Sequence, residues 1–204
     1  MLNEEILKGS GGGISCYIIE GRNVLDVIAK LFGFEAATLL RSLGKLMICE
    51  GVFKEVYIVS GELINVIKVI FKSGRIPYSA GLYLGRLRRE KPKLIPSVNT
   101  IQIIYDKLGF RRALIVREEG IKPFLYGNDI IKKSVIKCIE PLELGDIVGI
   151  VGEDNYVYGV GLSVIGSCNE LNSLKDNDMV ARNIFDVGWY LRGGTEVRER
   201  MFKL

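Results

Sequence analysis

The fold of the first half of the chain is decided by residues 56–74, VYIVSGELINVIKVIFKSG. The branched and aromatic run at its start is typical of a buried strand. Ser60 can cap a helix, and the apolar residues after it recur at helical spacing until Gly74. These apolar residues are Leu63, Val66, Ile67, Ile70 and Phe71. The stretch therefore predicts a strand followed directly by an amphipathic helix.

The same two patterns recur on both sides of this stretch. Apolar residues at helical spacing predict one helix over residues 24–31 and another over residues 101–108, each followed by a glycine. Short branched and aromatic runs predict strands at residues 14–19 and 82–88. We therefore expect residues 1–111 to form an α+β domain in which helices flank a mainly antiparallel sheet.

After residue 111, short apolar runs alternate with turn signals. The runs predict strands at residues 113–116, 135–139, 147–151, 156–164 and 179–184. Turns are expected at Glu118-Glu119-Gly120, Gly145-Asp146 and Glu153-Asp154-Asn155, a short helix over residues 126–132, and a surface loop over residues 166–177. The pattern predicts a second domain, residues 112–204, built as a small mixed β-barrel.

The composition excludes most familiar catalytic chemistry. The chain has 204 residues, of which 48% are apolar and 25% charged, as in a folded globular protein. Histidine is absent, which removes Ser-His-Asp and Cys-His nucleophile systems and His-ligated zinc. The carboxylate pairs lie in expected turns, where water would keep them ionised. We therefore expect no catalytic residue, no metal and no cofactor.

Neither the glycines nor the cysteines of the sequence indicate a binding or catalytic site. The glycines at 9, 11, 12 and 13 lack the preceding strand of a dinucleotide fingerprint and the Lys-Ser/Thr pair of a phosphate loop, so a flexible loop is expected. Cys16, Cys49, Cys138 and Cys168 stand about thirty residues or more apart and are expected to be isolated buried thiols. No signal-peptide pattern and no run of eighteen apolar residues is found, so we expect a cytoplasmic protein.

Positive charge is concentrated in the first half of the chain. Residues 1–122 hold 19 Lys and Arg against 12 Asp and Glu, whereas residues 123–204 hold 9 against 12. Within residues 68–93, eight cations stand against the single acid Glu90. Phosphate backbones favour such clusters, and strand alternation would project Arg86 and Arg88 together. An ordinary solvated cationic surface is the alternative interpretation.

From Val56 onward, the order of features resembles the Nip-seven family of ribosome-biogenesis factors, found in archaea and eukaryotes, which carry a pre-PUA domain followed by a PUA domain. The resemblance covers about residues 45–195. It rests on residues 56–60, 79–86, the helix after Ser97, and the glycine landmarks at 145–148, 159–161 and 188–192. The segment Phe124-Leu125-Tyr126-Gly127-Asn128 is its most specific part.

The resemblance implies a non-catalytic, monomeric, archaeal protein that binds RNA in large-subunit ribosome assembly and pre-rRNA processing, with other assembly proteins as further partners. PUA domains typically meet RNA with the short helix after the first strand and with the last strand. Uridine-rich or loop single strands are the expected target. The candidate RNA-binding residues are Gly127, Asn128, Lys132, Lys133, Lys137, Arg182, Arg192, Arg198, Arg200 and Lys203, with Arg86 and Arg88 from the first domain.

Two other functions stay open. PUA domains are often attached to catalytic domains, so the chain could be an RNA-modifying enzyme. The acidic second half could instead make it a protein-docking module in ribosome assembly.

Overall fold

This computed structural model describes residues 5–8, 14–19, 22–51, 53–75, 77, 79–88 and 93–192. The chain forms two compact units, Met1–Thr100 and Ile101–Leu204. The boundary expected between residues 111 and 112 stays a prediction. Within the described part of the chain, every helix is too short or too polar to cross a membrane.

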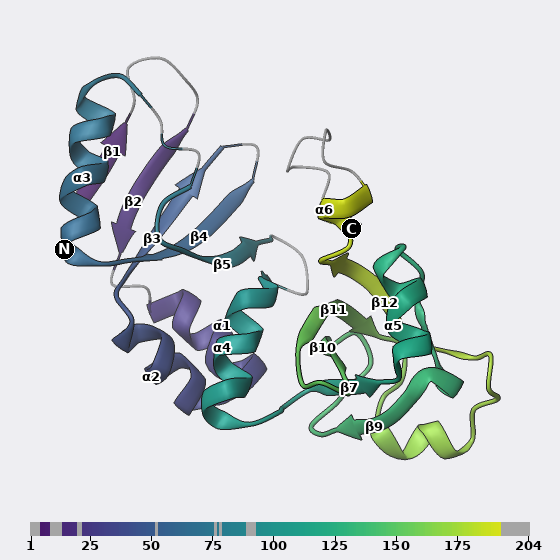
Figure 1. Cartoon of the computed structure of the whole chain (residues 1–204). Helices are drawn as coiled ribbons and strands as arrows, with labels where there is room; N and C mark the ends of the chain where they lie inside the picture. The colour runs from purple at the N-terminus through teal and green to yellow at the C-terminus, as the bar shows by residue number, and fades with distance from the viewer. Residues whose placement is uncertain are drawn as a thin grey trace. The chain divides into compact units, whose positions relative to one another are not determined.

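The first unit is built on a six-stranded antiparallel sheet (Figure 1). Its strands follow one another in chain order: β1 (Glu5–Lys8), β2 (Ser15–Ile19), β3 (Lys45–Glu50), β4 (Lys54–Val59), β5 (Leu82–Leu87) and β6 (Leu94–Pro96). Each strand is antiparallel to the next. The expected α+β class with a mainly antiparallel sheet is therefore confirmed.

Four helices accompany this sheet: α1 (Arg22–Phe32), α2 (Phe34–Ser42), α3 (Gly61–Lys72) and α4 (Val98–Leu108), the last of which continues into the second unit. The predicted cap of α3 is present, because the Ser60 hydroxyl accepts a hydrogen bond from the Leu63 amide at 3.2 Å. Ile64, Ile67 and Phe71 of α3 are buried with residues of β2, β3 and β4. The sequence patterns predicted α1, α3 and α4 but neither α2 nor β3.

The second unit is a curled mixed sheet. Its strands are β7 (Ala113–Val116), β8 (Ile130–Ile131), β9 (Val135–Ile139), β10 (Ile147–Gly152), β11 (Val157–Ser163) and β12 (Met179–Asp186), in the spatial order β8-β12-β11-β10-β7-β9. The pairing of β7 with β10 is parallel and the others are antiparallel. The sheet closes only partly, as a half-barrel, in agreement with the expected small mixed β-barrel.

The helix of this unit lies earlier in the chain than expected. The turn expected at residues 118–120 is the first turn of α5 (Glu118–Leu125), and residues 126–132 are a turn, β8 and the start of a 3-10 helix, η1 (Lys132–Ser134). Arg117 supplies the extended residue before α5, and two acids occupy its first turn, where the helix dipole favours negative charge. Another 3-10 helix, η2 (Cys168–Asn172), lies in the expected loop, and α6 (Trp189–Arg192) follows β12.

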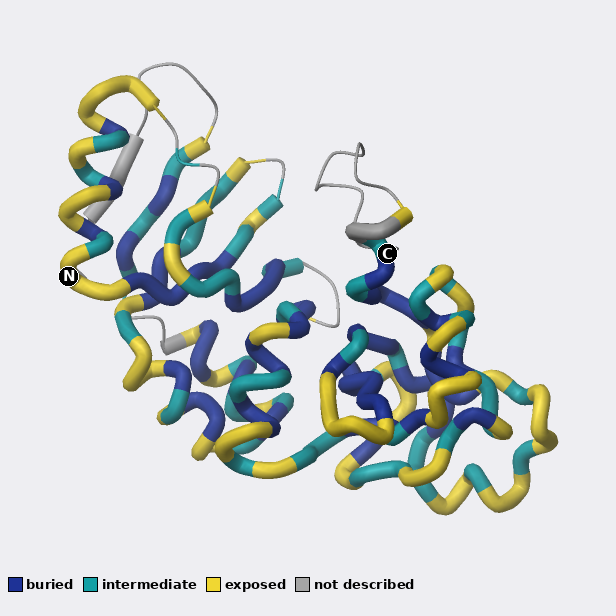
Figure 2. Tube along the Cα trace, in the orientation of Figure 1, coloured by how far each residue is buried: buried dark blue, intermediate teal, exposed yellow. Residues whose placement is uncertain are grey.

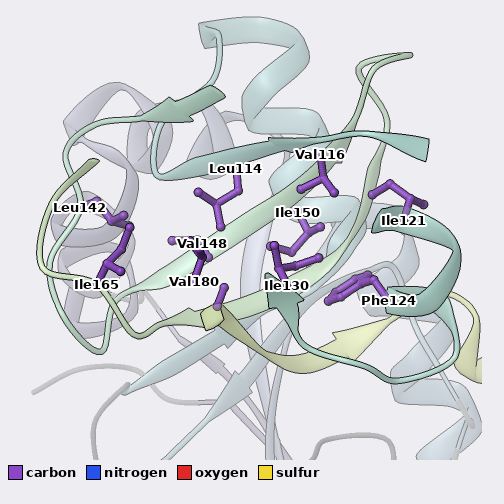
Figure 3. Packing of buried hydrophobic residues seen from close by; sticks show 11 residues of the cluster. Leu114, Val116, Ile121, Phe124, Ile130, Leu142, Val148, Ile150, Ile165 and Val180 are labelled. Carbon is purple, nitrogen blue, oxygen red and sulfur yellow. The ribbon is translucent and has the colours of Figure 1, made fainter. Parts of the chain in front are cut away.

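The core of the second unit fills the space between α5 and the curled sheet. Figure 3 shows Ile121 and Phe124 at one end of this cluster and Leu142 and Ile165 at the other. All four side chains are at most 5% exposed. Figure 2 shows the buried residues concentrated along the strands. The apolar cluster thus fixes α5 at one end of the half-barrel, next to β8 and β12.

The expectation of four isolated thiols is wrong in this structure. Cys16 of β2 lies directly opposite Cys49 of β3, and the two form a disulfide. Cys138 of β9 and Cys168 of η2 form a second one. The sequence did not indicate either pair, because the cysteines lie far apart in the chain and only strand pairing and a loop bring them close enough to bond.

Candidate nucleic-acid interface

The chain makes a tight, fully bonded turn where α5 ends. The Gly127 amide donates to the Phe124 carbonyl at 2.8 Å, and the Asn128 amide donates to the Pro123 carbonyl at 3.1 Å. These two bonds are those of a Schellman motif, which requires a left-handed residue after the helix. Gly127 has a φ of 90°, which glycine adopts without a Cβ clash. The turn places Tyr126 and Asn128 on the surface.

A buried asparagine of β12 holds this turn against the sheet. The Asn183 amide nitrogen Nδ2 donates to the Phe124 carbonyl at 2.9 Å and to the Asn128 carbonyl at 3.3 Å. The backbone amide of Asn183 donates to Asp129 Oδ1 at 2.8 Å. Asn183 is 2% exposed. One strand residue therefore satisfies polar groups on both sides of the Gly127 turn.

Asn183 also hydrogen-bonds a buried carboxylate that forms an ion pair. Asp186 is 2% exposed, and its Oδ2 accepts a hydrogen bond from Asn183 Nδ2 at 3.0 Å. Arg192 of α6 meets both oxygens of this carboxylate in a forked contact, at 2.9 Å and 3.0 Å. Such a bidentate pair is geometrically specific. The contact ties the segment after β12 back onto the strand.

A close approach of backbones completes the junction between α5 and α6. A Cβ added to Gly188 would lie 2.1 Å from the Leu125 carbonyl oxygen and 3.0 Å from Arg192 Nη1. Only glycine therefore fits at this position. The Arg192 guanidinium consequently lies beside the carbonyl end of α5, where a cation is favourable.

Five of the predicted RNA-binding residues lie along or next to β8 and β12. Gly127 and Asn128 form the turn before β8, Lys132 and Lys133 follow β8, and Arg182 is an exposed residue of β12. The amides of Lys132 and Lys133 donate to the carbonyls of Asp178 and Asp176, at 2.9 and 3.0 Å, which ties η1 to the start of β12. The structure thus brings these residues together along one edge of the sheet.

The remaining cations of the second unit are placed differently. Lys132 is half-buried, with its Nζ 3.7 Å from Asp176 Oδ1, whereas Lys133 is exposed. Lys137 is exposed on β9, at the other end of the strand order. The predicted role of Arg192 as a phosphate ligand is weakened, because its fork is occupied by Asp186. Arg198, Arg200 and Lys203 lie outside the described residues.

The prediction that Arg86 projects into solvent with Arg88 is wrong. Val56 pairs with Gly85 and Tyr57 pairs with Tyr83, so Leu84 is an extra residue that breaks the alternation of β5. Arg86 consequently shares a face with Tyr83 instead of opposing it. Arg86 is 5% exposed, and its guanidinium carbon Cζ lies 3.6 Å from the centre of the Phe53 ring.

Acidic side chains gather at the opposite end of α5. The Glu118 amide donates to Glu153 Oε2 at 3.4 Å, which joins the helix start to the β10–β11 turn. Asp154 accepts a hydrogen bond from the Tyr158 hydroxyl at 2.7 Å, and this bond raises the pKa of Tyr158. Glu118, Glu119, Glu153 and Asp154 are all exposed. These four carboxylates form an exposed acidic cluster beside the start of α5.

Sequence reasoning missed Asp129, Asn183 and Asp186. The available signal was the segment RNIFD, residues 182–186, in which polar residues interrupt an otherwise buried strand. Buried polar residues of this kind require partners, but the partners of Asn183 at the α5 turn come from more than fifty residues earlier in the chain.

Residues 112–195 match the family described as the UPF0113 PUA domain. The whole chain is similar to a hypothetical protein from the hyperthermophilic archaeon Pyrococcus horikoshii, with 15% identity over 84% of this chain and 94% of that chain and a TM-score of 0.60. It is also similar to a PUA domain from Aeropyrum pernix K1, with 12% identity over 90% and 94% of the two chains and a TM-score of 0.52. No curated protein matches the sequence. The second unit therefore matches a PUA domain, and the two archaeal structures share the fold of the chain.

Proposed function

We propose that the protein binds RNA through its PUA domain, along β8 and β12 and the turn after α5. The observation that carries this proposal is that residues 112–195 match the UPF0113 PUA domain family. PUA domains typically meet RNA with the helix after the first strand and with the last strand, which are α5 and β12 here. The surface between them presents Asn128, Lys133 and Arg182 to solvent.

The cationic side chains in this proposal differ in their exposure to solvent and in their ion pairs, and therefore in how readily they can bind a phosphate. Lys133 and Arg182 are exposed and can each meet a phosphate, Lys132 can do so by leaving its 3.7 Å contact with Asp176, and the exposed Lys137 would extend the path past η1 onto β9. Arg192 mainly stabilises the buried Asp186 carboxylate through its forked contact. Four phosphate contacts on single-stranded RNA give a log–log salt slope of about −3, from about −0.7 per contact.

Fluorescence anisotropy with a fluorescein-labelled U10 RNA over a KCl series tests this proposal. We expect the full chain to bind with a slope near −3, and the variant Lys133→Ala/Arg182→Ala to bind more weakly with a slope reduced by about 1.4. Lys72→Ala changes an exposed lysine of α3 in the first unit and serves as the matched control, with no expected effect. Absence of binding to RNA of any sequence at low salt would refute the proposal.

The finer proposal is a non-catalytic factor of the Nip-seven type, acting in large-subunit assembly and pre-rRNA processing. The order of β4, α3, β5 and α4, followed by a PUA domain, supports it. So does the lack of histidine, which removes the commonest general base. Crosslinking in cells with sequencing of the attached RNA should recover pre-rRNA, and recovery of tRNA instead would contradict it.

A docking module is the second candidate, and the acidic end of α5 favours it. Four exposed carboxylates from α5 and the β10–β11 turn form a surface suited to a basic protein. Affinity capture with and without ribonuclease separates the candidates. Partners that persist after ribonuclease treatment and are lost in Glu119→Lys/Glu153→Lys would favour docking.

A further inference from the structure

Two tyrosines of the PUA domain present their rings to solvent in opposite electrostatic surroundings. Tyr126, at the carbonyl end of α5, is 75% exposed, and Tyr156, in the β10–β11 turn, is 64% exposed. The Tyr156 amide donates to Asp154 Oδ1 at 3.1 Å, so this ring lies in the acidic cluster. A polyanion is repelled there.

Cations flank Tyr126 instead. Lys122 lies four residues earlier on α5, on the same helix face, and its side chain is 70% exposed. The Arg192 guanidinium lies beside the Leu125 carbonyl, the group that directly precedes Tyr126. Arginine has five N–H donors, and the forked contact with Asp186 uses two of them. Two cations therefore lie near the residue that carries this ring: Lys122, whose Nζ is also 2.9 Å from Glu118 Oε1, and Arg192, which is paired with Asp186.

The backbone beneath Tyr126 is rigid. Its amide donates to the Pro123 carbonyl at 3.0 Å, and the following glycine and asparagine complete the Schellman motif. Asn183 bonds the carbonyls on both sides of the turn. Among the described residues, the Tyr126 hydroxyl makes no hydrogen bond. The fold thus fixes the backbone that carries this exposed aromatic side chain.

We propose that Tyr126 is a base-stacking platform for single-stranded RNA, with the exposed Lys122 and the N–H groups of Arg192 that Asp186 does not use available to neighbouring phosphates. The proposal rests on the RNA-binding function proposed above and adds a residue to it. Proteins hold single strands by combining exposed aromatic rings with nearby cations, because every base offers a π-face to the ring. A duplex offers no unstacked base, so the site selects single strands.

Binding of the full chain to two probes tests this assignment: labelled U10 RNA and an abasic ribose-phosphate 10-mer of the same charge. Tyr126→Ala should weaken U10 binding roughly 5- to 150-fold, the range for loss of one stacked base, and leave abasic binding unchanged. Tyr126→Phe should bind U10 within about twofold of the parent, since it keeps the ring. Tyr156→Ala, an exposed tyrosine at the other end of α5, is the matched control and should bind both probes like the parent.

Three results would overturn the assignment while leaving RNA binding intact: U10 affinity unchanged in Tyr126→Ala, an equal loss on the abasic probe, or an equal loss in Tyr156→Ala. Failure of the parent protein to bind U10 at all is a different result. It would remove the proposed function itself, and with it this site.

Discussion

Replacing Arg192 by methionine removes one partner of the buried ion pair and keeps an apolar stem of similar length. The variant leaves the Asp186 carboxylate, 2% exposed, with Asn183 Nδ2 as its remaining donor in the described structure. Breaking a buried pair in this way costs about 3 to 5 kcal/mol. The Arg192 side chain is 27% exposed, so water can partly replace it, and we expect the lower end, about 3 kcal/mol.

Equilibrium urea unfolding measures this cost through the fluorescence of Trp189, the single tryptophan of the chain, which lies three residues before Arg192. At the usual urea dependence, about 3 kcal/mol lowers the midpoint by roughly 1 to 3 M. The control is Lys122→Met, which removes an ion pair of the same 2.9 Å length whose side chains are 70% and 76% exposed. Water screens this exposed pair, so its loss should lower the urea midpoint far less than the loss of Arg192.

A double-mutant cycle decides whether the two groups act as a pair. Asp186→Asn removes the buried charge, so Arg192→Met should cost at least about 1 kcal/mol less in that background than in the parent. Equal costs in the two backgrounds would refute the reasoning. So would a cost for Arg192→Met no larger than that for Lys122→Met.

Three further predictions concern stability. Burial raises the pKa of Tyr105, whose hydroxyl donates to the Arg111 carbonyl at 2.7 Å, so the folded state keeps its proton above the ordinary value of 10.0 and the unfolded state does not. The parent should therefore lose about 1.4 kcal/mol per pH unit above about pH 10 relative to Tyr105→Phe in urea unfolding at pH 8 to 11, and parallel profiles would contradict this. Gly149→Ala places a Cβ 2.5 Å from the Tyr105 hydroxyl and should cost about 1 to 3 kcal/mol in the same assay, whereas a neutral effect would show that the ring shifts freely. The Cys138–Cys168 disulfide closes a loop with a sequence separation of 30, so Cys138→Ser should destabilise by about 3.7 kcal/mol under non-reducing conditions, and an intact mass showing free thiols in the parent would contradict the bond.

Local signals made α3 predictable from the sequence. Its cap, its apolar spacing and its final glycine all lie within residues 60–74, and each acts on neighbours in the chain. The second unit was recognisable for a similar reason, since its strands and turns recur at short intervals. The hairpin turn at residues 153–155 is confirmed, with Asn155 at a φ of 66° between β10 and β11.

Long-range geometry explains what the sequence could not provide. The extra residue in β5 depends on pairing with β4, so strict alternation placed Arg86 on the wrong face. The start of α5 depends on packing of Ile121 and Phe124 into the half-barrel, and a Glu-Glu-Gly segment alone is equally suited to a turn. The partners of the cysteines were invisible for the same reason. The sequence shows which residues are cationic, but it does not show that the Arg192 guanidinium is paired with the buried Asp186.

Ultraviolet crosslinking of U-rich RNA to the full chain, followed by mass spectrometry of the attached peptides, tests the central claim most directly. We predict crosslinks in the peptides that contain Tyr126 and β12, because these elements form the proposed path of the strand. Crosslinks confined to the first unit or to the β10–β11 turn would contradict RNA binding by the surface of the PUA domain described above.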